Sequence, residues 1–285
     1  MSKSIVLGVD IGGSHITAAI INLEEGILIN ESWKRESVNS LDDAETILEN
    51  WSKVISASLK TTKLSVNRIG IAMPGPFDYK EGICLIKEQD KFKSLYKLNI
   101  KNELAERLNF RPENIHFIND AEAFTKGEVF AGSAKGAKCV MGLTLGTGLG
   151  SGIFEAGQTK DLSLWNAPFL NGISEDYLST RWFVNRYKQL TGTELKGVKE
   201  LVEVVKTDHS AVRVFMEFGH NMAEFLMPII KKYKLEMVII GGNISLAFDQ
   251  FSPELVSILE ANHLSAKVKI TKLNEHAALI GAACM

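Results

Sequence analysis

Two stretches of the sequence decide the fold: Leu7-Gly8-Val9-Asp10-Ile11-Gly12-Gly13 and Met141-Gly142-Leu143-Thr144-Leu145-Gly146-Thr147. They match at one constant offset, which pairs Gly8 with Gly142, Asp10 with Thr144 and Gly12 with Gly146. Each copy is typical of an apolar strand, a tight glycine-rich turn and a second apolar strand. Two such hairpins can align by chance, but a duplicated architecture explains the echo better. It predicts two similar half-molecules that each present a glycine-rich turn to a shared cleft.

Strands and helices alternate along the rest of the chain. In the first half the pattern predicts a helix from Ser40 to about Lys60, strands at Arg68–Met73 and Ile115–Ile118, and a helix at Asn99–Asn109. We expect Ser40 to cap the first helix together with Asp43, and its apolar stripe to begin at Leu41. In the second half the pattern predicts helices from Ser174 to about Leu190, from the residues after Asn243 to about Ala261, and at His276–Ala283, a long stretch at Ser210–Lys232, and strands at Glu236–Ile240 and Lys267–Thr271. This alternation predicts an α/β fold with mainly parallel pairing.

Composition limits the possible classes of function. The chain has 285 residues, which is about two domains, and its 32 Lys+Arg against 34 Asp+Glu give a net charge of −2. This balance argues against attraction to nucleic acid or to an anionic membrane through bulk charge. No apolar run reaches the roughly 20 residues of a spanning helix. The cysteines (Cys84, Cys139 and Cys284) are odd in number and far apart, which favours reduced thiols in a cytoplasmic protein.

Polar and glycine-rich loops follow the predicted strands. Ligands of open α/β sheets lie beyond the carboxyl ends of strands, where such loops converge. The loops concerned are Asp10-Ile11-Gly12-Gly13-Ser14, Pro74-Gly75, Asn119-Asp120, Leu145–Gly150 and Gly241-Gly242-Asn243. Glycine-rich turns at strand ends aim backbone N–H groups at phosphate oxygens. The run Gly146–Gly150 is not a dinucleotide fingerprint, because a strand follows it where that site needs a helix.

In their order along the chain, these blocks resemble those of sugar kinases of the ROK family, within the actin-like ATPase superfamily. The blocks are Gly8–Ser14 and Leu145–Gly152 for two phosphate loops, Pro74-Gly75-Pro76-Phe77-Asp78 beside the sugar, Asn119–Ala123 with the catalytic base, and Ile239–Asn243 for adenosine. The resemblance implies an actin-like ATPase (ribonuclease H-like) fold. Its two lobes would lie around a central nucleotide and sugar cleft, with residues 1–118 plus about 273–285 in the N-terminal lobe and 119–272 in the C-terminal lobe.

The resemblance also implies a role for each matching residue. Asp120 matches the catalytic base, although an aspartate there could instead cap the following helix. Asn119 and Gly75 match sugar-binding positions. Asp10 matches a carboxylate that holds Mg²⁺ through water, although it could instead form the turn. The nucleotide-binding residues would be Asp10, Gly12, Gly13, Ser14, Gly146, Thr147, Gly148, Gly241, Gly242 and Asn243.

Some positions match less well or depart from the family. Glu175 lies four residues before Ser179, as does a family glutamate that contacts the sugar, but an acidic residue also suits a helix start there. Asp161 matches the acid of the family's ExGH motif, whereas Leu164 replaces its histidine and can make no side-chain hydrogen bond. Because no cysteine lies between Cys139 and Cys284, we expect no structural zinc site.

The resemblance therefore implies ATP-dependent phosphorylation of a hexose or aminohexose, glucokinase-like, by in-line transfer with an Asp base and with ATP and Mg²⁺ as cofactors. The alternative is a non-catalytic sugar-sensing or scaffold protein of the same fold. We expect no helix-turn-helix, because the first hairpin starts at Ile5. The resemblance suggests a homodimer that binds a small-molecule sugar and neither nucleic acid nor membrane. No residue indicates which sugar, or which of its hydroxyls, is accepted.

Overall fold

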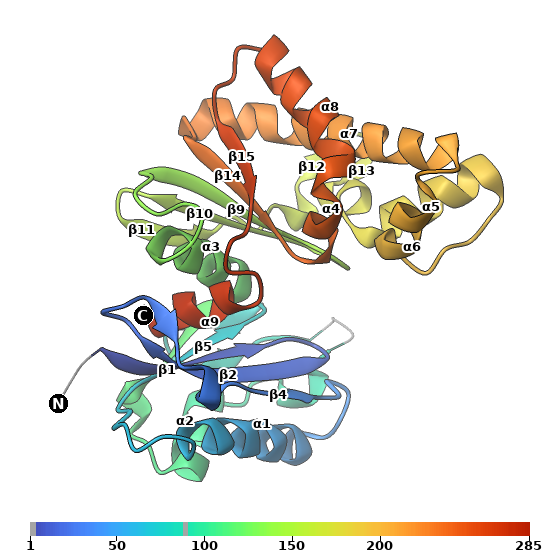
Figure 1. Ribbon diagram of the computed structural model, residues 1–285. Coiled ribbons are helices and arrows are strands. Elements are labelled where there is room, and N and C mark those ends of the chain that lie inside the picture. Colours follow the sequence, from blue (N-terminus) through green and yellow to red (C-terminus); the bar gives the residue numbers. More distant parts are fainter. Residues whose placement is uncertain (1–3, 88–90) are drawn as a thin grey trace. The chain divides into compact units, whose positions relative to one another are not determined.

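A computed structural model describes residues 4–87 and 91–285 (Figure 1). The chain forms two compact units: unit 1 comprises Met1–Gly132 and Glu275–Met285, and unit 2 comprises Ser133–Asn274. The first boundary therefore falls after 132 and not after the expected 118. The difference is helix α3 (Asp120–Phe130), which packs against the C-terminal helix α9 (His276–Ala283) of unit 1.

The sheet of unit 1 has the strand order β3-β2-β1-β5-β8, and β4 also pairs with β2. These strands are β1 (Ile5–Ile11), β2 (His15–Asn22), β3 (Ile27–Leu28), β4 (Lys34–Ser37), β5 (Ile69–Met73) and β8 (Ile115–Asn119). The strands β1, β5 and β8 are parallel, whereas β1 and β2 form an antiparallel hairpin. The first glycine-rich segment is therefore the turn of a hairpin, as its pattern predicts.

The sheet of unit 2 repeats this arrangement, with the order β11-β10-β9-β14-β15. Its strands are β9 (Cys139–Leu145), β10 (Leu149–Glu155), β11 (Gln158–Asp161), β14 (Met237–Gly241) and β15 (Lys267–Ile270). Again the hairpin strands β9 and β10 are antiparallel, and β9, β14 and β15 are parallel. Each sheet is thus mixed. The expectation of mainly parallel pairing was wrong because the hairpins contribute their own antiparallel strands.

Helices cover both faces of the sheet in unit 1. On one face lie α1 (Ala44–Leu59) and α2 (Ile100–Leu108), with the buried Trp51 packed edge-on against Phe92. On the other face α9 packs directly on β1 and β5. It approaches so closely that a Cβ on Gly8 or Gly70 would lie 2.2 Å or 1.9 Å from a carbonyl oxygen of α9. Gly8 of the repeated segment therefore serves the packing and not the ligand loop.

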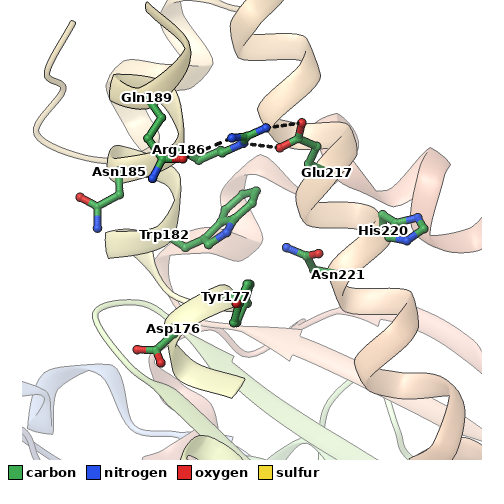
Figure 2. A pocket seen from close by; sticks show the side chains of 9 residues that line it. All are labelled: Asp176, Tyr177, Trp182, Asn185, Arg186, Gln189, Glu217, His220 and Asn221. Atoms are coloured by element: carbon green, nitrogen blue, oxygen red, sulfur yellow. Dashed lines mark hydrogen bonds and ion pairs between the residues drawn. The ribbon is translucent and has the colours of Figure 1, made fainter. Parts of the chain in front are cut away.

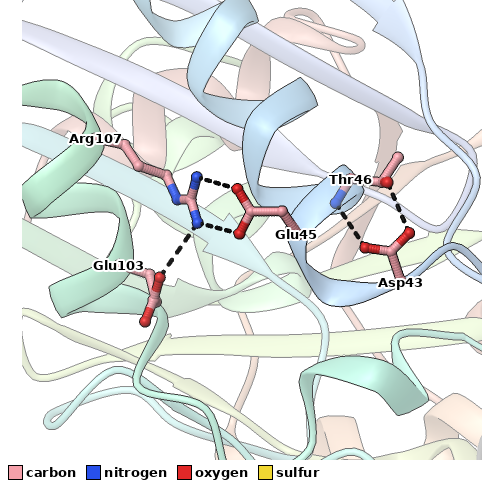
Figure 3. A network of polar contacts seen from close by, with 5 residues as sticks. All are labelled: Asp43, Glu45, Thr46, Glu103 and Arg107. Carbon is pink, nitrogen blue, oxygen red and sulfur yellow. Dashed lines mark hydrogen bonds and ion pairs between the residues drawn. The ribbon is translucent and has the colours of Figure 1, made fainter.

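The start of α1 differs from the sequence expectation (Figure 3). Asp43 is the N-cap, and its carboxylate accepts hydrogen bonds from the backbone N and the hydroxyl of Thr46 at 3.0 and 2.7 Å. We expected Ser40 to cap this helix and Leu41 to begin its apolar stripe. Both residues lie before the helix, and Leu41 is 70% exposed. Asp is as good a cap as Ser, and the one nearer the apolar stripe is used.

A charged contact joins α1 to α2 (Figure 3). The guanidinium of Arg107 on α2 donates to both carboxylate oxygens of Glu45 at 2.9 and 2.7 Å. Glu103 adds a longer contact at 3.5 Å. These hydrogen bonds raise the pKa of Arg107 and lower that of Glu45. The contact orients two helices at the surface of unit 1.

In unit 2 the helices are α4 (Ser174–Tyr177), α5 (Thr180–Thr191), α6 (Val198–Val204), α7 (His209–Tyr233) and α8 (Phe248–Ala261). The single helix predicted from Ser174 to about Leu190 is therefore two, interrupted at Leu178 and Ser179. The core under α5, α7 and α8 is aromatic, and the ring of Phe218 contacts the rings of both Phe183 and Phe251. Its buried phenylalanines fix where the two helices α5 and α7 lie against each other.

Short elements complete the fold. Two small strand pairs are β6 (Phe77–Asp78) with β7 (Ile83–Cys84), and β12 (Pro168–Phe169) with β13 (Gly172–Ile173). The 3₁₀ helices are Asn30–Ser32, Lys93–Leu95, Pro112–Asn114, Leu164–Asn166 and Asn243–Ala247. Within residues 4–87 and 91–285, no helix is long and apolar enough to cross a membrane.

Candidate active site

The hairpin of unit 1 carries a carboxylate whose charge is unfavourable. Asp10 is the last residue but one of β1, and the turn that follows the strand is closed by a 2.9 Å hydrogen bond from the N of Gly12 to the O of His15. Desolvation raises the pKa of Asp10 from 3.8 to about 7, and the negative charge of Asp120 adds to this rise. Arg35 on β4 acts in the opposite direction, and Glu275 adds to the rise. A positive charge placed beside Asp10 would therefore be strongly stabilised.

Asn119 and Asp120 have different roles at the start of α3. Asn119 is the N-cap: its side-chain oxygen accepts from the backbone N of Ala121 at 2.9 Å and of Glu122 at 3.1 Å. Asp120 is the first helical residue, and its carboxylate accepts a hydrogen bond from the N of Ala121 at 2.9 Å. The role of N-cap, considered above for Asp120, thus falls to Asn119. The half-buried carboxylate of Asp120 lies close enough to Asp10 for their charges to interact.

The expected sugar-binding residues of unit 1 meet around a tyrosine. The amide of Asn119 donates to the Oη of Tyr79 at 3.3 Å, and Tyr79 donates to the carbonyl oxygen of Met73 at 3.1 Å. A Cβ on Gly75 would lie 3.2 Å from the same Oη. Gly75 and Asn119 are therefore neighbours, although 44 residues (119 − 75) separate them in the sequence.

The hairpin of unit 2 is held by Glu175. The N of Gly146 donates to the O of Gly148 at 3.0 Å and closes the turn. The carboxylate of Glu175 accepts from the N of Leu149 at 3.0 Å, and a Cβ on Gly148 would lie 2.8 Å from the same oxygen. Arg181 approaches the other oxygen at 3.7 Å. Glu175 thus contacts the turn itself, a third role besides the sugar contact and the favourable helix start.

The loop after β14 packs against the same hairpin. Gly241 pairs with Thr144, and Gly242 has a φ of +78°. A Cβ on Gly242 would lie 2.3 Å from the carbonyl oxygen of Leu145. Only glycine fits here, because both the backbone conformation and the space exclude a side chain. Asn243, exposed, begins the following 3₁₀ helix.

Asp161 and Leu164 lie apart from the turn. Asp161 ends β11 opposite Gly152, is exposed, and accepts from the N and the Oγ of Ser163, both at 2.7 Å. The N of Leu164 donates to the Oγ of Ser151 at 3.0 Å, while its side chain packs against the apolar core. The apolar side chain at 164 is therefore explained by packing.

The structure brings the predicted residues together in two sets. Asp10, Gly12, Gly13, Ser14, Gly75, Asn119 and Asp120 gather in unit 1, and Gly146, Thr147, Gly148, Glu175, Gly241, Gly242 and Asn243 gather in unit 2. A shared cleft between the two sets stays a prediction.

Other residues at these sets escaped the sequence reasoning. They are Tyr79, Arg35, and Lys91, whose side chain would lie 3.7 Å from a Cβ on Gly13. In unit 2 the hydroxyl of the buried Ser179 has no hydrogen-bond partner among the described residues. Its neighbour Thr180 donates its N to the O of Gly146 at 2.7 Å. Apart from Thr180, which begins α5, these residues lie on loops and on the edge strand β4, where only the folded contacts reveal them.

The donor set for a metal is small. In the part of the chain that the structure describes, no three His, Cys, Asp or Glu side chains are grouped so as to hold a metal ion. The two interacting carboxylates of Asp10 and Asp120 suit a hard cation that keeps water and phosphate oxygens as its other ligands. Mg²⁺ fits this description. The expected absence of zinc stays a prediction.

The chain matches a known protein family over most of its length. The sequence pattern described as the ROK family matches residues 6–160 and 171–285. Asp161 and Leu164 fall in the unmatched segment, so the alignment of Asp161 with the family's acid rests on spacing alone.

Named relatives point to two kinds of protein. A glucokinase of Thermotoga maritima is 25% identical over 99% of this chain and 97% of its own length. An N-acetyl-D-glucosamine kinase of Photobacterium profundum is 27% identical over 72% of this chain and 74% of its own. A xylose repressor of Caldicellulosiruptor bescii is 22% identical over 98% of this chain and 77% of its own.

Solved structures share the fold. A ROK family glucokinase from Streptomyces griseus, in complex with glucose and AMPPNP, superposes with a TM-score of 0.78. It is 24% identical, over 98% of each chain. A ROK hexokinase from Thermus thermophilus also gives a TM-score of 0.78, at 19% identity over 98% of this chain and 96% of its own. The predicted actin-like ATPase fold is confirmed.

Proposed function

This chain belongs to the ROK family, and we propose that it is a kinase that transfers the γ-phosphoryl group of ATP to a hydroxyl of a hexose or aminohexose. The glucokinase and N-acetyl-D-glucosamine kinase relatives support this substrate class. The observation that carries the proposal is the pair of carboxylates Asp10, near the end of β1, and Asp120, directly after β8, whose charges interact.

In this proposal Asp120 is the general base. The sugar hydroxyl attacks the γ-phosphorus, the bond to the β-phosphate oxygen breaks, and the hydroxyl proton passes to the carboxylate of Asp120. Because Asn119 caps α3, the backbone of the helix does not depend on the carboxylate of its neighbour. Asn119 and Gly75 would bind sugar hydroxyls beside Tyr79, an arrangement supported by their shared contacts. Glu175 and Asp161 are proposed as further sugar contacts.

The glycine hairpins would bind the nucleotide. We propose that Gly12, Gly13 and Ser14 in unit 1, and Gly146, Thr147 and Gly148 in unit 2, direct backbone N–H groups at phosphate oxygens. A Cβ on Gly146 would meet no atom within 4 Å, so packing in unit 2 does not require glycine there. Gly241, Gly242 and Asn243 would border the adenosine. Mg²⁺, when bound, would neutralise phosphate charge, and Asp10 would hold it through water.

The pKa of Asp10 supports this use of the site. At neutral pH an Asp whose pKa is about 7 is only partly ionised in the ligand-free protein. A cation that binds beside it shifts the equilibrium to the charged form, so that protons and the metal compete for the same carboxylate. We expect metal-dependent activity to fall as the pH drops below about 7.

A non-catalytic sugar sensor of the same fold is the second candidate. The xylose repressor relative and the apolar Leu164, in place of the family histidine, favour it. The carboxylate at position 120 favours the enzyme. We further propose a cytoplasmic protein, because the three cysteines are free and the proposed reaction uses ATP, and a homodimer, as the family resemblance suggests. The net charge of −2 supports the absence of nucleic acid as a partner.

A substrate panel tests the function. Purified protein is mixed with ATP, Mg²⁺ and one sugar at a time (glucose, mannose, galactose and their N-acetylamino forms), and ADP release is followed in a coupled assay. We expect sugar-dependent ADP release with at least one of them, well above the release without sugar. Binding of a sugar without ADP release would favour the sensor, and neither binding nor release would contradict both candidates.

A further inference from the structure

Unit 2 contains a cavity that the proposed reaction does not use. It has a volume of about 580 Å³, within the range of small-molecule sites, and lies between α4, α5 and α7 (Figure 2). The short helix α4 separates it from the glycine hairpin. Glu175 contacts the hairpin, whereas the next two residues, Asp176 and Tyr177, line the cavity.

Aromatic rings form the base of this cavity. Trp182 lies between α5 and α7, with Tyr177 beside it (Figure 2). The indole is held in place by ring contacts to Phe183 at 5.4 Å and Phe218 at 5.8 Å, and Tyr177 is held by Phe169 at 5.5 Å. Both rings are only partly buried, so each is fixed by the core and still offers surface to a ligand. Rigid rings bind flat apolar surfaces at a low cost in conformational entropy.

Neutral hydrogen-bonding groups stand around the rings. The amide of Asn221 points from α7 toward Trp182 and Tyr177, and Asn185 and His220 lie farther out (Figure 2). Among the nine lining residues, hydrogen bonds and ion pairs join only Arg186 to Glu217 and Gln189. The amides of Asn185 and Asn221 therefore make none with the rest of the lining. Each amide can both donate to and accept from a hydroxyl group.

The charges of the lining disfavour an anion. Its single guanidinium, Arg186, donates to both carboxylate oxygens of Glu217 at 2.5 and 2.9 Å. Glu217 also accepts from Arg213, and its pKa is lowered by these contacts, first of all by Arg186. Asp176 adds a second carboxylate to the lining. The guanidinium groups of Arg186 and Arg213 together balance the carboxylates of Glu217 and Asp176, so the lining offers a phosphate group no cation that is not already paired.

We propose that this cavity is a second binding site, for an uncharged sugar. A pyranose ring has an apolar face of C–H groups that matches the Trp182 and Tyr177 rings, and hydroxyl groups that match the amides of Asn185 and Asn221. A phosphorylated sugar would find no unpaired cation in the lining for its phosphate group. The inference does not depend on phosphoryl transfer, because no residue of the cavity belongs to the proposed reaction.

Binding stoichiometry tests the site. In equilibrium dialysis with labelled D-glucose and N-acetyl-D-glucosamine, we expect two equivalents of at least one of them per chain. Asn221→Leu keeps the side-chain size but removes the amide, and should leave one equivalent, with at least a tenfold loss of affinity at the cavity. Asn262→Leu, an exposed amide at the end of α8, is the matched control and should keep two. Glucose 6-phosphate should not compete at the cavity.

Each result is decisive. If the parent binds one equivalent of sugar and Asn221→Leu binds none, the result supports the cavity and counts against the sugar site of the proposed function. The same number of equivalents in Asn221→Leu and Asn262→Leu overturns the inference, as does binding of adenosine in place of sugar. Because a core variant can fail to fold, the indole gives a second readout. Sugar bound in the cavity should change the tryptophan fluorescence of the parent and of Trp33→Phe. A fluorescence change of the same size in Trp182→Phe, at the sugar concentrations that fill the cavity of the parent, would contradict the site.

Discussion

In unit 1 the strand that leads into the glycine hairpin carries Asp10 next to its end, whereas in unit 2 the matching strand carries Thr144. Both strands lie third in sheets of the same order, and both run parallel to the next strand along. The backbones are thus repeated, but the ionisable groups are not. Unit 1 places Asp10 and Asp120 at its strand ends, and unit 2 uses glycine and the hydrogen bond from Leu149 to Glu175.

The difference suggests that the two units have different roles in the proposed reaction. A carboxylate at a strand end can take a proton or face a cation, and unit 1 has two whose charges interact. A turn free of ionisable side chains, such as Gly146–Gly148 in unit 2, offers backbone N–H groups, which suit phosphate. We therefore expect substitutions in unit 1 to affect the chemical step, and those in the hairpin of unit 2 to affect nucleotide affinity.

The largest effect should come from Asp120. Asp120→Asn removes the proposed base while keeping size and hydrogen-bonding capacity, and kcat should fall by roughly 10²–10⁴-fold. ATP affinity, measured by calorimetry, should change little because the hairpins are untouched. Asp249→Asn, an exposed carboxylate on α8, is the control and should keep full turnover. Near-normal kcat in Asp120→Asn would refute the assignment of the base.

In unit 2, substitution of a glycine that serves ligand binding should have a different effect from substitution of a glycine that serves packing. Gly146→Ala introduces a Cβ into open space, so the melting temperature should hardly move, whereas KM for ATP should rise about tenfold if phosphate approaches that backbone. Gly242→Ala introduces a Cβ at 2.3 Å from a carbonyl oxygen and at positive φ, and should cost about 3 kcal/mol of stability. Equal losses of stability in both variants would contradict this separation.

Asp10 makes unit 1 sensitive to pH. Its pKa is higher in the folded chain, at about 7, than the ordinary 3.8, so the folded form binds this proton more tightly. The stability that the group contributes is therefore complete below about pH 4 and is lost as the pH rises to about 7. The side chain at position 10 in Asp10→Asn cannot ionise. At pH 8 the melting temperature of this variant should therefore exceed that of the parent by several degrees more than it does at pH 5.

Magnesium gives the matching control. Mg²⁺ should raise the melting temperature of the parent at pH 8 more than at pH 5, because the cation competes with the proton for Asp10. The same addition should have little effect on Asp10→Asn at either pH. If the stability of the parent had the same pH profile as that of Asp10→Asn, ionisation of Asp10 would not destabilise the folded chain.

Local patterns predicted much of this fold, because the signals concerned lie within a few residues. The hairpins follow from their glycines, and α2 from the amphipathic pattern of Asn99–Asn109, the two ends of which are its caps in the structure. The same holds for α9, predicted with its observed bounds. The choice of Asp43 over Ser40 as a cap depends on contacts that the local pattern does not contain.

Long-range contacts decided the rest. The membership of α3 in unit 1 follows from its packing on α9, where a Cβ on Gly127 or Gly281 would lie 2.0 or 1.8 Å from a carbonyl oxygen of the other helix. Tyr79 joins Gly75 to Asn119 only because β5 and β8 are neighbours in the sheet. No spacing in the sequence encodes such meetings. The candidate site was therefore predictable where a motif carries it, and not where a partner comes from elsewhere in the chain.

The smallest effect, and the one that most sharpens the comparison, concerns Glu175. Glu175→Gln keeps an oxygen that can accept from the N of Leu149 but removes the charge that Arg181 approaches. Glu175→Ala removes both. If the residue holds the hairpin, Glu175→Gln should behave like the parent, and Glu175→Ala should raise KM for ATP about threefold to tenfold, with KM for sugar unchanged.

A sugar contact gives the opposite pattern. Both variants should then raise KM for sugar, because an amide lacks the negative charge that strengthens hydrogen bonds from hydroxyl groups and has only one acceptor oxygen. KM for ATP should stay constant. Arg181→Ala separates charge from contact: it removes the ion pair and leaves the bond to Leu149 in place. A rise in KM for ATP in Glu175→Ala alone would mean that unit 2 fixes its phosphate loop with a carboxylate, where unit 1 leaves its carboxylates to face the substrate.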